Sequence, residues 1–282
     1  QERILAYRRL FEEENATIIT TFDALMDRLV RPEVLRGFLP RLKAEDTLDL
    51  EKLRQHLVGM GYESAYQVDA PGQFAVRGGI VDIFALTEEL PYRIELWGDE
   101  IDSIRTFDPD SQRSVDTLDE IVVYPAAELV LTKAQQEAGL KQITAEGKRL
   151  SEQYRKEMKT EEAHRLEQAV ELLQEQVEEF GSVRAAESYL TYFYQDTVSF
   201  LEFASRCAAR RDQKLLIFAD EPARCLEKAA AVEKEFSDSM QQRLEKGYIL
   251  PGQMDVLYSH EAVTAEMQRL GCVLVSAMEL RA

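Results

Sequence analysis

Two acidic residues at the end of an apolar run are the first candidates for chemistry. Residues 215–221 read LLIFADE, and an apolar strand that ends in Asp220-Glu221 is typical of the metal-holding strand of ATPases. Such a site also needs a glycine loop of the pattern G-x-x-x-x-G-K-[ST]. Residues 147–149 (GKR), inside a predicted helix, lack the rest of that pattern. We therefore expect Asp220 to cap a helix that starts at Glu221, with Pro222 in its first turn. The sequence predicts no catalytic residue and no cofactor site.

Four further carboxylates have the chemistry of metal ligands. They are Asp82, Asp99, Asp102 and Asp108. Asp99 falls in a predicted hairpin turn and Asp108 precedes a proline in another, and aspartate is a usual turn former in both settings. No histidine accompanies them at metal-ligand spacing, so we predict no metal site.

Charged and aromatic side chains alternate with apolar ones in residues 93–97 (RIELW). In a strand, this pattern buries the Ile and Leu side chains and turns Arg93, Glu95 and Trp97 to the opposite face. Arg77 of the preceding strand would point the same way. Arg and Trp are enriched among the residues that dominate binding at protein interfaces. Two interpretations stay open: this face docks a partner protein, or the helices that follow cover Trp97, with Arg93 lying over it.

Composition argues against several classes of function. Acidic residues outnumber basic ones by 52 to 34, and the resulting net charge of -18 repels phosphate backbones, so nucleic acid is not an expected direct partner. Cys207, Cys225 and Cys272 lie far apart without a C-x-x-C pair, which argues against disulfides and zinc and fits a reducing cytosol. No apolar run approaches membrane-spanning length. We predict a cytoplasmic protein without a membrane partner.

The elements that position these residues predict an α/β fold. Residues 74–113 predict three or four short strands separated by turns. The β-branched run 16–21 (ATIITT) predicts a buried strand between two helices. Residues 214–219 predict another buried strand, and residues 272–276 a parallel-type strand, with helices between them. The simplest architecture is one α/β layer built from both chain ends, with the sheet and a helical arm inserted into it.

The helical arm is predicted from residue 126 to about residue 180, where Gly and Pro are almost absent. Apolar residues repeat there at four-three spacing, at Leu166, Val170, Leu173, Val177 and Phe180. This pattern indicates a helix that packs along one seam, in a bundle of its own chain or in a self-associated coiled coil. The seam runs for only about two heptads, so we favour the bundle.

Four segments within residues 74–114 carry a family resemblance: FAVRGGIVDIF, PYRIEL, DEIDSIRTFD and SQRS. In order and spacing they resemble the bacterial transcription-repair coupling factors (the Mfd family), in the N-terminal region that is homologous to the excision-repair protein UvrB. The resemblance is dense over about residues 60–128. The run Gln112-Arg113-Ser114 points to the coupling factors rather than to UvrB itself.

The resemblance implies a fold of three parts. A degenerate RecA-like α/β layer, without a working nucleotide site, is formed by both chain ends. An inserted, mainly antiparallel β-sheet (α+β) domain binds UvrA, and a helical arm is the third part. The expected boundaries are 1–38 and 199–282 for the layer, 39–125 for the UvrA-binding domain and 126–198 for the arm.

The resemblance also implies site residues and partners. Arg77, Arg93 and Trp97 match positions at which the family contacts UvrA, with Trp97 in place of a more usual Phe, and Glu95 on the same face completes the predicted UvrA-binding set. The implied function is a non-catalytic adaptor that recruits UvrA to sites of stalled RNA polymerase. The alternative is a UvrB-like nucleotide-binding, damage-handling ATPase fragment.

Further partners follow from the same resemblance. In the full-length family, we expect this region to contact the C-terminal regulatory domain of the same protein. RNA polymerase, DNA and ATP are handled by other domains, whose motifs this sequence does not contain.

Overall fold

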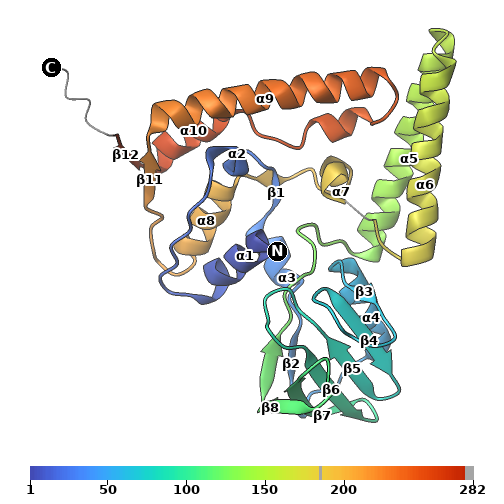
Figure 1. The fold of residues 1–282 in the computed structure, drawn as a ribbon, viewed down its shortest axis with the longest axis vertical. Helices are drawn as coiled ribbons and strands as arrows, with labels where there is room; N and C mark the ends of the chain where they lie inside the picture. The colour runs from blue at the N-terminus through green and yellow to red at the C-terminus, as the bar shows by residue number, and fades with distance from the viewer. Residues whose placement is uncertain (184–185, 277–282) are drawn as a thin grey trace. The chain divides into compact units, whose positions relative to one another are not determined.

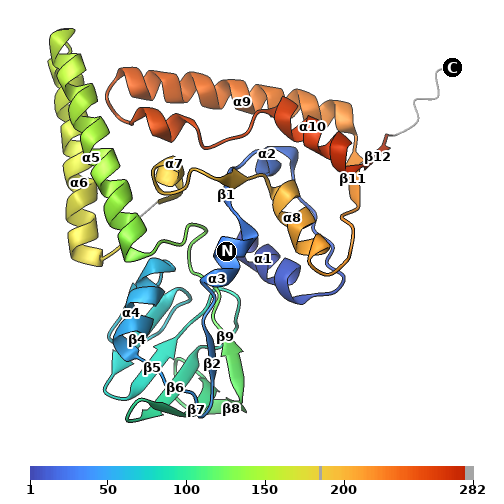
Figure 2. The same ribbon diagram turned by 180° about the vertical axis from the view of Figure 1, so that it is seen from behind.

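The computed structural model describes residues 1–183 and 186–276, whose contacts divide into two compact units. Unit 1 contains Gln1–Glu13, Glu33–Glu137 and the end of a helix from Gln176 onward. Unit 2 contains Glu14–Pro32, Ala138–Glu175 and the described residues from Ala186 onward. Each unit combines helices and strands (Figures 1 and 2), so the predicted α/β fold class is confirmed. The boundaries expected near residues 38, 125 and 198 stay a prediction.

Unit 1 is built around a six-stranded sheet with the strand order β3-β4-β5-β6-β7-β8. The strands from β4 to β8 pair antiparallel in sequence order, and β3 pairs in parallel with β4, so the predicted mainly antiparallel sheet is confirmed. The strands are β3 (Glu63–Ser64), β4 (Gln73–Arg77), β5 (Ile80–Ile83), β6 (Tyr92–Trp97), β7 (Glu100–Phe107) and β8 (Ser114–Leu118).

Glycines shape the hairpins that join the central strands. Gly78-Gly79 connects β4 to β5, and Gly98-Asp99 connects β6 to β7. Gly78 and Gly98 have φ angles of 60° and 67°, in the left-handed region that glycine adopts without strain. A Cβ atom on Gly79 would lie 2.9 Å from the carbonyl oxygen of Leu96. Gly79 therefore lies where two backbone segments approach closely, whereas Gly78 supplies the left-handed conformation of the turn.

The core of unit 1 lies on the inner face of this sheet. Phe74, Val81, Ile94 and Ile104 point there and are fully buried. Helix α4 lies beside β3 and β4 in both ribbon views (Figures 1 and 2). The remaining elements of this part of the chain are α1 (Glu2–Glu12), α3 (Pro32–Gly37), α4 (Leu50–Gly59) and the antiparallel pair β2 (Arg41–Lys43) and β9 (Glu120–Val122).

The predicted helical arm consists of α5 (Lys133–Lys156) and α6 (Thr160–Phe180), which lie side by side (Figures 1 and 2). A Cβ atom on Gly147 of α5 would lie 2.8 Å from the Val170 side chain of α6, so the two helices pack closely. Two leucines of the predicted seam are buried, which supports the bundle interpretation. No helix in the described part of the chain is long and apolar enough to cross a membrane.

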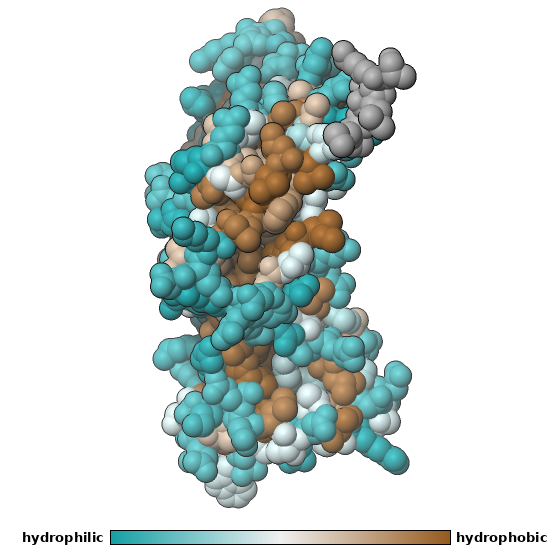
Figure 3. Space-filling view, turned by 90° about the vertical axis from the view of Figure 1, so that its left-hand side faces the viewer, coloured by the Kyte–Doolittle hydropathy of each residue, from teal (hydrophilic) through white to brown (hydrophobic). Residues whose placement is uncertain are grey.

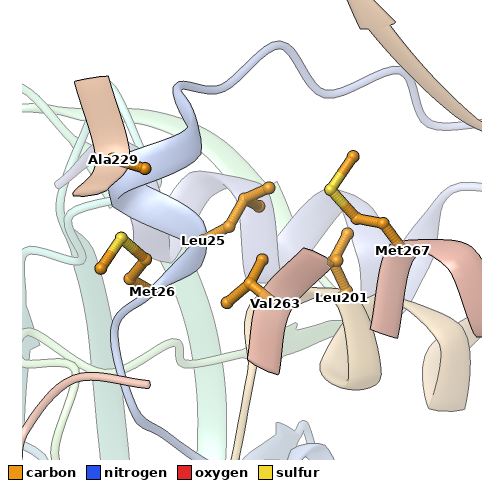
Figure 4. Close-up of a cluster of buried hydrophobic side chains, with 6 residues drawn as sticks. All are labelled: Leu25, Met26, Leu201, Ala229, Val263 and Met267. Carbon is orange, nitrogen blue, oxygen red and sulfur yellow. The ribbon is translucent and has the colours of Figure 1, made fainter. Parts of the chain in front are cut away.

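Unit 2 packs residues from the N-terminal part of the chain and from its C-terminal helices around one apolar core (Figure 4). The core side chains are Leu25, Met26, Leu201, Ala229, Val263 and Met267. They come from or directly adjoin α2 (Phe22–Leu25), α8 (Phe200–Ala209), α9 (Pro222–Glu245) and α10 (His260–Leu270). Residues 25–26 therefore share one core with residues 201–267, whereas Gln1–Glu13 belong to unit 1. The layer built from both chain ends stays a prediction. The short elements of this unit are β1 (Leu29–Val30), which pairs antiparallel with β10 (Thr197–Val198), and η1 (Ala186–Tyr189), α7 (Leu190–Phe193) and η2 (Pro251–Met254).

The parallel sheet of unit 2 consists of β11 (Ile217–Asp220) and β12 (Cys272–Val275). Ile217 packs against the core, whereas Phe218 and Val273 on the opposite face are 68% and 53% exposed. Apolar side chains accordingly gather on the side of this unit that Figure 3 presents. The prediction of a buried strand at 214–219 is wrong for this face, because the core packs against only one side of the sheet.

Residues 16–21 form no strand, although a buried strand is predicted there. The segment is unpaired, and Ile19 is 95% exposed. Its β-branched residues favour extended backbone, but a strand needs a neighbour to accept and donate its hydrogen bonds. None of the described strands pairs with this segment. The unit 2 core instead contains Leu25 and Met26, at the end of α2.

Candidate docking surface

Trp97 is the last residue of β6, and its side chain is 84% exposed. Ile94 in the same strand is fully buried, as predicted, whereas Leu96, also predicted to be buried, is half-buried. The register between β6 and β7 shifts between Glu95 and Leu96, and bulges of this kind turn side chains near functional sites. Covering a large, solvent-exposed indole ring with a partner protein lowers the free energy of the complex. The exposure of Trp97 therefore favours the docking interpretation over the covered one.

The two predicted arginines are held by one buried carboxylate, that of Asp82. Asp82 lies on β5 directly opposite Arg93 and is only 1% exposed. Arg93 donates from Nε to Oδ1 at 2.8 Å and from Nη2 to Oδ2 at 2.9 Å. Arg77 donates from Nη2 to the same Oδ2 at 2.7 Å. The sequence interpretation of Asp82 as one of several acids in the strands and turns misses this role.

Arg93 is fixed on three sides. Besides its bidentate pairing, its Nη2 donates to Oε1 of Gln112 at 2.8 Å, and its guanidinium carbon lies 4.1 Å from the ring centroid of the buried Phe107. Gln112 adopts a left-handed φ of 59° and donates to the carbonyl of Pro109, which fixes the turn that presents it. The hydrogen bond to Asp82 raises the pKa of the Arg93 guanidinium, against the opposing effect of partial burial. Arg93 therefore stays charged while only 14% of its side chain is exposed.

Glu95 is already paired within the sheet. Its Oε2 accepts a hydrogen bond from Nη2 of Arg105 at 2.6 Å and from the hydroxyl of Ser103 at 3.2 Å. Arg105 lies on β7 directly opposite Arg93 and is about as exposed as Glu95, at 34% against 32% of the side chain. We call the surface formed by Arg77, Arg93, Glu95, Trp97 and Arg105 the docking face.

The docking face offers unused donors beside its aromatic anchor. In the described part of the chain, Nη1 of Arg93 and both Nε and Nη1 of Arg77 take part in no hydrogen bond. With Asp82 and Glu95 the face and its support combine three cations and two carboxylates, a local excess of one positive charge on a chain of net charge -18. This arrangement can bind a partner's carboxylate next to an apolar pocket for Trp97.

The acidic pair considered for catalysis marks a helix terminus. Asp220 is the last residue of β11, Glu221 is the N-cap of α9 with a left-handed φ of 47°, and Pro222 is the first helical residue. The predicted cap at Asp220 is wrong, because proline suits the first helical position and moves the cap to the residue before it. The Glu221 side chain makes no capping hydrogen bond. Residues 147–149 lie within α5.

Two of the four carboxylates considered as metal ligands, those of Asp82 and Asp108, have structural partners. Oδ1 of Asp108 accepts a hydrogen bond from the Ser111 backbone at 2.7 Å, which closes the turn and lowers the pKa of Asp108. The Asp82 carboxylate pairs with Arg77 and Arg93. The backbone carbonyl of Asp99 accepts a hydrogen bond from the backbone N–H of Leu48 at 2.7 Å. Across the described ranges, no group of three or more His, Cys, Asp or Glu side chains is arranged to hold a metal ion.

The class of domain that carries the docking face follows from comparison with known families. Residues 41–129 match the family described as the UvrB interaction domain. The match begins at β2 and ends beyond β9, so it spans the whole sheet and every residue of the docking face. Residues 41–129 are thus similar to the UvrB interaction domain.

Relatives of known name extend the similarity beyond this domain. The chain is 31% identical over 272 residues to the transcription-repair-coupling factor of Bacillus subtilis, which covers 95% of this chain and 22% of that protein. It is 36% identical over 126 residues to the coupling factor of Haemophilus influenzae, covering 45% of this chain and 11% of that protein. It is 35% identical over 191 residues to the UvrABC system protein B of Thermosipho africanus, covering 68% and 29%.

These comparisons confirm the resemblance that the sequence motifs indicate. The chain is similar along nearly its whole length to one part of a transcription-repair-coupling factor. It spans less than a third of the length of each of these three relatives.

Proposed function

We propose that this chain is a non-catalytic adaptor module that binds UvrA in nucleotide excision repair. The observation that carries the proposal is the docking face of the UvrB interaction domain. There, an 84% exposed Trp97 stands beside arginines that a buried carboxylate holds in place. In a full-length coupling factor, the module would recruit UvrA to sites of stalled RNA polymerase.

The proposed binding has two physical components. Trp97 would bury on the order of 150–250 Å² of ring surface in an apolar pocket on UvrA. Arg77 and Arg93 would donate their unused N–H groups to carboxylates of UvrA, in charge-assisted hydrogen bonds that discriminate against neutral surfaces. Both arginines are already ordered in the free chain, so less side-chain entropy is lost on binding.

The remaining roles of a coupling factor are assigned to other parts of the full-length protein. We propose that RNA polymerase, DNA and ATP bind to domains outside this chain. We further propose that the protein works in the cytoplasm and that this module needs no cofactor. The acidic net charge of -18 supports a module that leaves nucleic acid to those domains. We further propose that the C-terminal regulatory domain of the full-length protein contacts this module.

A second candidate function is a UvrB-like ATPase fragment. The observation in its favour is the 35% identity over 191 residues to a UvrABC system protein B. Against it, the sequence lacks the glycine loop that cradles phosphates, and Asp220 and Glu221 form a strand end and a helix cap. Saturable binding of a fluorescent ATP analogue with Mg²⁺ would favour the ATPase, whereas the adaptor binds none.

The proposed function is tested by titrating the 282-residue chain with purified UvrA of Bacillus subtilis, the species of the relative matched over 95% of the chain. Isothermal titration calorimetry should give saturable binding, which salt weakens. A flat titration at micromolar concentrations, with both proteins folded, would exclude the adaptor function.

A further inference from the structure

The Asp82 side chain lies where solvent barely reaches it. The residue is 1% exposed at the centre of the sheet, between β4 and β6. Burying a carboxylate is costly unless cations and hydrogen bonds compensate it, and both arginines of the docking face do so. Because no partner protein can touch so buried a group, Asp82 can affect binding only through the arginines that it contacts or through the stability of the sheet.

The geometry of the contact decides which edges of the arginines stay available. Asp82 occupies the Nε–Nη2 edge of Arg93, and the second proton of Nη2 goes to Gln112. The planar guanidinium therefore keeps Nη1 for a partner. Arg77 gives only Nη2 to Asp82 and keeps the rest of its fork. Both guanidinium groups bind the same oxygen, Oδ2, so one carboxylate sets the position of both cations.

We propose that Asp82 is a positioning residue for UvrA binding, which holds Arg77 and Arg93 so that their unused N–H groups present a preformed site for carboxylates on UvrA. The inference rests on the proposed function. It adds a residue that never touches the partner, and it narrows the ligand chemistry to a pair of carboxylates close enough to be bound by two cations that share one anchor.

Without the anchor, two long side chains would have to be ordered during binding. Immobilising each rotamer-rich side chain costs a measurable part of the affinity, so the loss for both is about 10-fold in Kd. The Asp82→Asn variant keeps the shape and one acceptor oxygen but removes the charge. We expect it to weaken UvrA binding by about this factor, whereas Asp116→Asn, at an exposed position of β8, leaves binding unchanged.

A double-mutant cycle distinguishes positioning from a general loss of structure. The UvrA affinity is measured for the wild-type chain, Asp82→Asn, Arg77→Ala and the double variant. If Asp82 acts through the arginine, the double variant loses clearly less than the product of the two single losses. In the free chain, the Arg93 Nε–H signal in an NMR spectrum should exchange faster with water in Asp82→Asn, because Asp82 accepts the hydrogen bond of that group.

The outcomes separate this inference from the function on which it rests. A folded Asp82→Asn variant with wild-type affinity, or multiplicative losses in the cycle, overturns the positioning role while UvrA binding stands. Absence of UvrA binding by the wild-type chain overturns the proposed function itself. If Asp82→Asn does not fold, Arg77→Lys carries the test: it keeps a cation beside Asp82 but lacks the forked donors, and wild-type affinity would refute the inference.

Discussion

Replacing Arg93 by alanine should destabilise unit 1 and not only the complex with a partner. The substitution removes two charge-assisted hydrogen bonds from a carboxylate that is 1% exposed, and it uncovers the ring of Phe107. Breaking a buried ion pair costs roughly 3–5 kcal/mol, and Asp82 keeps Arg77, which places the loss near the lower limit. The lost stacking on Phe107 adds about 0.5–1 kcal/mol. We therefore expect the free energy of unfolding to fall by about 3.5 kcal/mol.

Urea unfolding followed by far-UV circular dichroism measures this loss. With a slope of about 3 kcal/mol per molar urea, the midpoint should move down by about 1 M. Arg54→Ala is the matched control, because Arg54 is exposed on α4 and pairs only with Glu51 of the same helix; its midpoint should stay within error. An Arg93→Ala midpoint equal to that of the wild type would refute the structural role assigned to the Asp82 carboxylate.

Three further predictions concern the salt dependence of binding, the hairpin glycine Gly79 and the pH dependence of stability. Raising the ionic strength from about 0.05 M to about 0.5 M should weaken UvrA binding roughly 10-fold, because exposed charges are screened; a salt-independent Kd in calorimetry would argue against the arginines. Gly79→Ala should cost about 1–3 kcal/mol in urea unfolding, since its Cβ would meet the Leu96 carbonyl at 2.9 Å, whereas Gly37→Ala meets nothing within 4 Å and should be neutral. The third prediction is a dependence on pH. Glu233 accepts hydrogen bonds from the backbone and ring of His260, which lower the pKa of Glu233, so its contribution to stability is present above about pH 5 and is lost as the pH falls through the lowered pKa. The difference between the wild-type midpoint and that of Glu233→Gln should therefore shrink on acidification, and a difference that grows would contradict this sign.

Local patterns were sufficient to predict the sheet and the exposed side of β6. Alternation along residues 93–97 places Ile94 inside and Trp97 outside, and it needs no knowledge of the rest of the chain. The glycines of the two hairpins also act locally, since a positive φ or a close backbone approach has few other solutions. The structure adds that Trp97 is open to solvent, which the sequence leaves undecided.

Features that depend on a neighbour could not be read from one segment. The role of Asp82 requires the register that sets it opposite Arg93, and the contribution of Gln112 requires the turn that brings it back over the sheet. Simple alternation could not place Arg105, because Ile101 and Phe107 have the same parity in β7 and are buried; its pairing with Glu95 was needed to see its role. The strand predicted at residues 16–21 also depended on a neighbour. This β-branched run stays unpaired because none of the described strands lies beside it.

The docking face is tested most directly by comparing the UvrA binding of the wild-type chain with that of Trp97→Ala. Because Trp97 is 84% exposed, its removal should leave the unfolding midpoint unchanged, so a change in Kd reports the interface alone. We expect Trp97→Ala to lose about 2 kcal/mol of binding free energy, roughly 30-fold in Kd. The control Phe218→Ala, which changes an exposed aromatic of unit 2, should bind as the wild type does. A Trp97→Ala variant that binds UvrA with wild-type affinity would contradict the docking face.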